Sequence, residues 1–111
     1  MLRTGLLWKW RILVIFSHKK QLRNDLDEIQ NILLQYGWIQ GNPGSTETGF
    51  CLIGAANYYF EAIEHDANQK RIDRVKDALE SIVGTVWVWN DKPGRTLDEV
   101  LILINQAIEA V

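Results

Sequence analysis

The chain has 111 residues, of which 47% are apolar and 23% charged. This composition is typical of one soluble globular domain, and it excludes a disordered chain or two separate domains. A single cysteine, Cys51, excludes an internal disulfide and a multi-cysteine zinc site, and it favours a reducing compartment such as the cytoplasm.

The net charge of −2 is distributed very unevenly. Six basic residues lie within residues 1–23 and precede the first acid, Asp25, whereas the remaining chain has six bases against fourteen acids. A basic segment that docks on its own acidic body is the favoured interpretation. Binding of the basic segment to nucleic acid or to an anionic membrane is the alternative, but an acidic body would repel either polyanion.

Residues 1–18 form the basic arm of the predicted single domain 1–111. The apolar run at 6–16 is interrupted by Lys9 and Arg11 and is shorter than the ~20 residues that a spanning helix needs, so we expect no membrane anchor. No small-residue cleavage site follows, which argues against a signal peptide. Alternation of Trp8 and Trp10 with the two basic residues predicts an amphipathic strand over 8–16.

Residues 19–111 are predicted to form a helical body. The first helix is indicated by an apolar stripe at helical spacing, with Ser17 as a candidate N-cap and Gly37 as the left-handed residue at its end. Charged and amide side chains, Asp25 among them, are expected on its solvated sides. The stripe consists of Leu22, Leu26, Ile29, Leu33 and Tyr36.

Two further helices are predicted over residues 47–64 and 68–83. The first of these is apolar nearly all round and therefore central, and Gly54 in its interior suggests a close backbone approach by a neighbour. The second is a surface helix with Ile72, Val75, Leu79 and Ile82 on its core-facing side and Arg71 among its solvated residues, and Gly84 is expected to end it.

The last part of the chain combines a strand candidate with a helix. β-Branched and aromatic residues predict a short strand over 85–89, which could pair with residues 8–16. Thr96 and Glu99 form a capping box at the start of the last helix. The predicted fold is therefore mainly α, a compact bundle of four helices with a short two-stranded pairing between 8–16 and 85–89.

No residues with the spacing of a metal site or a catalytic set are apparent. His18 and His65 are the two histidines and lie on separate elements, and Cys51 lies ~21 Å from His65 along one helix. The glycine-rich stretch 41–46 lacks the Lys-Ser/Thr pair of a phosphate loop. We expect no metal and no cofactor.

The loop at 89–95 is the best site candidate. A structural role, with Asp91 paired to Arg95, is the favoured interpretation of this loop. The alternative is a recognition surface, because Trp and Arg are frequent at interface hot spots. The candidate partner-binding residues are Trp8, Trp10, Trp87, Trp89, Asn90, Asp91 and Arg95.

Three stretches resemble a family of small uncharacterised proteins from actinobacteria, other bacteria and their phages. They are Tyr-Gly-Trp-Ile-Gln-Gly at 36–41, Phe-Cys-Leu-Ile-Gly-Ala at 50–55 and Trp-Asn-Asp-Lys-Pro-Gly-Arg-Thr at 89–96, the last followed by Glu99 and Val100. The resemblance covers residues 22–110 and implies a compact helical domain. It supplies no catalytic residues.

These observations lead to three hypotheses of function. The first is a non-enzymatic, cytoplasmic protein-binding or regulatory factor of a phage or mobile element, inhibiting or modulating a host complex, with a protein partner or a second copy of itself. The second is a small enzyme or ligand-binding domain with a pocket around Trp38, Cys51, Asn90, Asp91 and Arg95. The third is nucleic-acid binding through Lys9, Arg11, Lys19 and Lys20.

Overall fold

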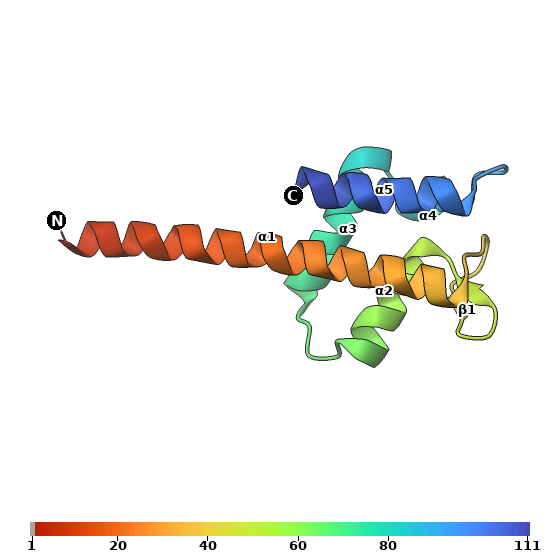
Figure 1. Ribbon diagram of the computed structural model, residues 1–111, viewed down its shortest axis with the longest axis horizontal. Coiled ribbons are helices and arrows are strands. Elements are labelled where there is room, and N and C mark those ends of the chain that lie inside the picture. Colours follow the sequence, from red (N-terminus) through yellow and green to blue (C-terminus); the bar gives the residue numbers. More distant parts are fainter. Residues whose placement is uncertain (1) are drawn as a thin grey trace.

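The computed structural model describes the backbone of residues 2–111 and the side chains of residues 17–111. Within this part of the chain, a long helix is followed by a small hairpin and then by shorter helices, with the last of these above the long helix and the first of them below it in the view of Figure 1. The elements are α1 (Leu2–Tyr36), β1 (Gly44–Ser45), β2 (Gly49–Phe50), α2 (Leu52–Tyr58), the π-helix η1 (Tyr59–Ile63), α3 (Gln69–Val83), α4 (Val86–Asn90) and α5 (Leu97–Ala110).

Helix α1 is one continuous helix that includes the segment predicted to be a strand. The predictions of a strand over 8–16 and of a helix N-cap at Ser17 are therefore wrong. Almost every residue of that segment is apolar, so alternation of two basic residues cannot distinguish a strand from a helix. Side chains 17–20 are exposed, and the helix before residue 21 runs clear of the other elements (Figure 1).

From Leu22 onward, α1 forms one wall of the core. Leu26, Ile29 and Leu33 are completely buried, which confirms the predicted apolar stripe. Gly37 ends the helix with a φ of 96°, and its amide donates to the Leu33 carbonyl at 2.9 Å. Helix α5 packs along one side of α1, and α2 and α3 pack along another (Figure 1).

The second predicted helix begins later than expected. Residues 44–50 form an antiparallel hairpin, in which Ser45 and Thr48 bond across the turn, and α2 starts only at Leu52. The Cys51 thiol caps α2 by accepting from the Gly54 amide at 3.2 Å. A β-carbon at Gly54 would lie 1.9 Å from the Pro43 carbonyl oxygen, so the predicted close backbone approach is confirmed.

Helix α2 passes directly into the π-helix η1. The Glu64 amide donates to the Tyr59 carbonyl at 2.7 Å, which closes a wide five-residue turn. Tyr59 and Phe60 are both buried although they are adjacent in the sequence. Asn68 then caps α3, and Gly84 follows it with a φ of 75°, as predicted.

Residues 85–89 do not form a strand, and the predicted pairing with 8–16 is wrong because both segments are helical. In α4, Val86 and Asn90 are buried one turn apart while Trp87 and Val88 are exposed. Helical spacing thus places the two buried residues on one side, and this outweighs the strand preference of the sequence. The capping box of Thr96 and Glu99 at the start of α5 is confirmed.

The core joins α1, α2, η1, α3, α4 and α5 into one hydrophobic cluster, so the mainly helical, compact bundle expected from the sequence is confirmed. The strand pairing is formed instead by β1 and β2. Over the part of the chain that the structure describes, none of the helices is both long enough and apolar enough to cross a membrane.

Candidate functional site

Asn90 lies at the centre of a buried polar network at one end of the molecule. Its side-chain oxygen accepts from the Trp38 indole N–H at 2.7 Å and from the Leu52 amide at 3.1 Å. Its amide group donates to the Ile39 carbonyl at 3.3 Å and to the Asp91 carboxylate at 3.0 Å. An asparagine side chain has two acceptor sites and two donor hydrogens, and all four are used here.

Asp91 and Gln40 extend this network to the loop surface. The Asp91 carboxylate accepts from the Gly41 amide at 2.9 Å, and this bond, followed by the bond from Asn90, holds the pKa of Asp91 below its ordinary value of 3.8. The Gln40 side chain donates to the carbonyls of Asn90 and Lys92 at 3.0 and 2.8 Å. Hydrogen bonds therefore hold the segments 38–41 and 90–92 side by side.

Arg95 does not pair with Asp91, contrary to the favoured prediction for this loop. Its guanidinium lies 4.0 Å from the Trp89 ring centroid, donates to the Trp89 carbonyl at 3.0 Å and pairs with Glu99 at 2.6 Å. The ion pair with Arg95 is the largest cause that lowers the pKa of Glu99. Arg95 thus holds α4 against the first turn of α5.

The three sequence stretches 36–41, 50–55 and 89–96 converge on this network. Residues 37–39 bond to Phe50 through the Ile39 amide at 3.0 Å and the Gly37 carbonyl at 2.9 Å, and Asn90 bonds to both stretches. The residues of these three motif stretches therefore join the end of α1 to α2 and α4. The model of DUF6197, a family of unknown function, matches residues 18–110.

The chain belongs to this family. No curated protein and no solved structure matches it. The match leaves residues 1–17, most of the projecting part of α1, outside the DUF6197 domain.

A second buried polar cluster was missed at the level of sequence. Asp25 is completely buried in α1 and receives two bonds from the Arg71 guanidinium, at 2.6 and 2.8 Å. The Tyr59 hydroxyl donates to the same carboxylate at 2.9 Å, and Glu64 pairs with Arg71 at 3.2 Å. The predictions that Asp25 and Arg71 face solvent are wrong.

The electrostatics of the Asp25 cluster are those of a bidentate ion pair. Hydrogen bonding to Asp25 is the main cause that raises the pKa of the Arg71 guanidinium, and burial, followed by the bond to Asp25, raises the pKa of the Tyr59 hydroxyl. The arginine is charged and the tyrosine is neutral at physiological pH. Asp25, Tyr59, Glu64 and Arg71 come from four places in the sequence, and no short motif indicates their proximity.

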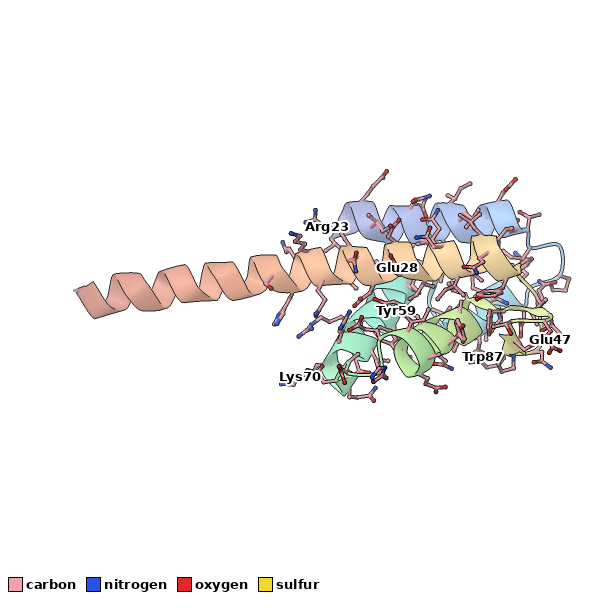
Figure 2. The ribbon with its side chains drawn as sticks, turned by 60° about the horizontal axis from the view of Figure 1, so that its bottom comes forward. Arg23, Glu28, Glu47, Tyr59, Lys70 and Trp87 are labelled. Carbon is pink, nitrogen blue, oxygen red and sulfur yellow. The ribbon has the colours of Figure 1, made fainter. Side chains whose placement is uncertain are left out.

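An apolar groove lies on the side of the body formed by α2, η1, α3 and α4. Its volume is about 330 Å³, and its floor is made by Leu52, Phe60, Val75, Leu79 and Val86. Trp87, with 59% of its surface exposed, lines the groove from α4, and the pair of Lys76 and Glu80 lines it from α3. Figure 2 shows Trp87 at the lower edge of the body, away from α1, whereas Tyr59 lies beneath α1.

The predicted site residues therefore separate into two groups. Trp87 is exposed beside the groove, and Trp89, Asp91 and Arg95 border a shallower hollow on its other side. Asn90 is fully buried, so its role is to hold this loop rather than to present a surface. The side chains of Trp8 and Trp10 lie outside the part of the chain that the structure describes.

The set proposed for a ligand pocket is occupied by contacts within the protein. Trp38 and Asn90 bond to each other, Cys51 is a buried helix cap, and Asp91 and Arg95 have different partners. Among the described residues, His, Cys, Asp and Glu side chains form no group of three that could hold a metal ion. The groove was not predicted from the sequence, because the apolar residues of its floor have the pattern of ordinary core residues.

Proposed function

We propose that this protein is a non-enzymatic protein-binding or regulatory accessory protein, and that the groove beside Trp87 receives apolar side chains of a protein partner. The observation that carries the proposal is an open apolar groove with a largely exposed tryptophan at its lip. Exposed tryptophan beside an apolar hollow is a frequent feature of interface hot spots.

The polar clusters support the same proposal. The side chains of Asn90, Asp25 and Arg71 are all bonded within the fold, and no buried polar side-chain atom among the described residues is left without a partner. Groups that already satisfy one another are suited to building a rigid surface. A rigid surface lowers the entropy cost of binding a partner.

More narrowly, we propose that a phage or another mobile element encodes this protein. Its partner then belongs to a host complex that the protein inhibits or modulates. The support for this form is the resemblance of the three motif stretches to small proteins of bacteria and their phages. Genomic neighbourhood tests it: we expect the gene inside a prophage or another mobile element, and a stable position among housekeeping genes would count against it.

The direct experiment compares partner capture by the wild-type chain with capture by Trp87→Ser and Ile102→Ser. Trp87 and Ile102 are 59% and 56% exposed on different helices, so Ile102→Ser is a matched control for loss of surface hydrophobicity. We expect the same partner with wild type and Ile102→Ser, and a loss of about 30-fold or more in affinity with Trp87→Ser. Equal capture by all three chains would overturn the assignment of the groove.

A further inference from the structure

The projecting part of α1 is too apolar to be stable as a helix that is surrounded by water on all sides. Of the eleven residues at 6–16, nine are apolar and two are basic. Soluble monomers rarely expose contiguous apolar patches larger than a few hundred Å². Isolated helices of this length are also marginal in water. The basic arm, which in the structure is the projecting helical segment 2–20, therefore requires a surface to pack on.

The arm's own body does not offer that surface. Helix α1 is unbroken from Leu2 to Tyr36, and the arm points away from the other elements (Figure 1). Residues 17–20 are exposed at the point where the arm leaves the body. Folding the arm back on its own groove would require breaking the helix, so the predicted docking of the arm on its own body is wrong.

A second copy has both the dimensions and the charge to cover the arm. At 1.5 Å per residue the arm is ~28 Å long, about half of the 58 Å length of the molecule, so arm and body are nearly equal in length. Two copies placed antiparallel would therefore lay each arm along the other body. The five bases of the arm would face a body, residues 21–111, that has seven bases and fourteen acids.

We propose that the protein forms a closed two-fold dimer in which the arm of each copy packs across the groove beside Trp87 of the other. The proposal rests on the proposed function in one respect, because it uses the groove as a protein-binding surface. A groove of about 330 Å³ accepts side chains rather than a whole helix, so the arm lies across it and inserts apolar residues.

The area available is sufficient for a stable dimer. At most two of the three aromatic residues of each arm, Trp8, Trp10 and Phe16, can share one face of the helix, because residues two apart lie on opposite faces. An aromatic side chain can bury ~150–250 Å². With the aliphatic residues of the same face and the partner surface that they cover, two reciprocal arms reach the ~1,200–2,000 Å² of a standard interface. The two contacts are identical, as a two-fold axis requires.

The test is a complementation experiment on full-length chains, measured by analytical ultracentrifugation. One chain carries Leu13→Asp in the arm and keeps the groove, and the other carries Trp87→Asp and keeps the arm. Each variant alone lacks both arm–groove contacts, so we expect dimerisation of each to weaken by about 30-fold or more. An equimolar mixture restores one contact, so a heterodimer of intermediate affinity is expected.

Ile102→Asp is the control on another face and should dimerise as the wild type does. Circular dichroism of each chain confirms that it is folded.

Other outcomes separate the inference from the proposed function. A wild-type chain that is monomeric at high concentration overturns the dimer but leaves partner capture by the groove intact. A dimer that is lost with Leu13→Asp but unaffected by Trp87→Asp also overturns the inference, and it points to another docking face. Arm-dependent binding of the monomer to vesicles containing phosphatidylserine, without dimerisation, would show that lipid covers the arm and would overturn the proposal as well.

Discussion

Asp25 and Asn90 are both completely buried polar side chains, but the protein stabilises them by different chemistry. Asp25 is a charge in the middle of α1, and it is compensated by the two bonds from Arg71 and by the Tyr59 hydroxyl. Asn90 is neutral and is satisfied by four hydrogen bonds, two of them to backbone groups. The first cluster ties α1 to η1 and α3, and the second ties the end of α1 to α2 and α4.

The two clusters should therefore respond differently to mutation and to pH. A buried ion pair is strongly destabilised when one partner is removed, because the other charge remains buried without compensation. The Asn90 side chain is neutral and does not itself change charge with pH, so its network loses hydrogen bonds one at a time, and of the side chains bonded to Asn90 only the Asp91 carboxylate carries charge.

The largest effect is expected for Asp25→Ala, which leaves Arg71 buried without its main partner. The free energy of unfolding should fall by about 3–5 kcal/mol, measured by chemical denaturation. The triple variant Asp25→Leu, Tyr59→Phe, Arg71→Met removes the charges together and should recover most of that loss. A triple variant as unstable as Asp25→Ala would show that the ion pair itself stabilises the fold. The loss in Asp25→Ala would then not come from the uncompensated charge of Arg71.

Asn90→Asp should be the next most damaging change. It keeps the oxygen that accepts from Trp38 and Leu52, but it turns the donating amide into an oxygen that faces the Ile39 carbonyl and the Asp91 carboxylate. We expect a loss of about 2–4 kcal/mol in unfolding free energy. Asn42→Asp is the matched control, because Asn42 is exposed and uses only its oxygen, which accepts from the Gly44 amide. Similar losses in the two variants would contradict the central role of Asn90.

A smaller effect should appear at alkaline pH and depend on Tyr59. The folded protein holds the Tyr59 proton more tightly than the unfolded chain, whose tyrosine pKa is 10.0, so the folded state binds more protons above that pH. The stabilising contribution is complete below pH 10 and is lost as pH rises further. Tyr59→Phe should show a flatter decline in unfolding free energy from pH 9 to pH 11 than the wild type. Parallel curves would contradict the raised pKa.

The smallest effect is expected in acid and concerns the loop beside Asn90. The pKa values of Asp91 and Glu99 are lowered in the folded protein from 3.8 and 4.5, so their contribution is present above those values and is lost as pH falls through the lower folded ones. Asp91→Asn should reduce the slope of unfolding free energy between pH 5 and pH 2. Asp98→Asn, which also removes one exposed carboxylate, is the matched control, and equal reductions of the slope in the two variants would contradict a specific contribution of Asp91.

The two clusters also differ in how visible they are in the sequence. The Asn90 loop is part of a recognisable motif with a capping box, so its position before α5 could be predicted, although the partners of Asp91 and Arg95 could not. Asp25 and Arg71 each look like a charged residue on a solvated helix face. Their pairing spans 46 residues, and helical periodicity contains no information about such a contact.

The errors around residues 8–16 and 85–89 have a common cause. Both segments are rich in tryptophan and β-branched residues, which favour strands locally. In α4 the preference is overridden because Val86 and Asn90 must both reach the interior one helical turn apart. In α1 the segment continues, without a break, the helix that carries the buried stripe from Leu22 onward.

Features that depend on neighbours in the chain could be predicted from the residues alone: the apolar stripe of α1, the glycines that end α1 and α3, the close backbone approach at Gly54 and the capping box of α5. The burial of particular polar side chains, the position of the groove beside Trp87 and the direction of the arm became known from the three-dimensional fold. The physical reason is that local conformation follows from backbone and side-chain contacts within a few residues. Burial and electrostatic pairing instead depend on groups brought together from distant parts of the chain.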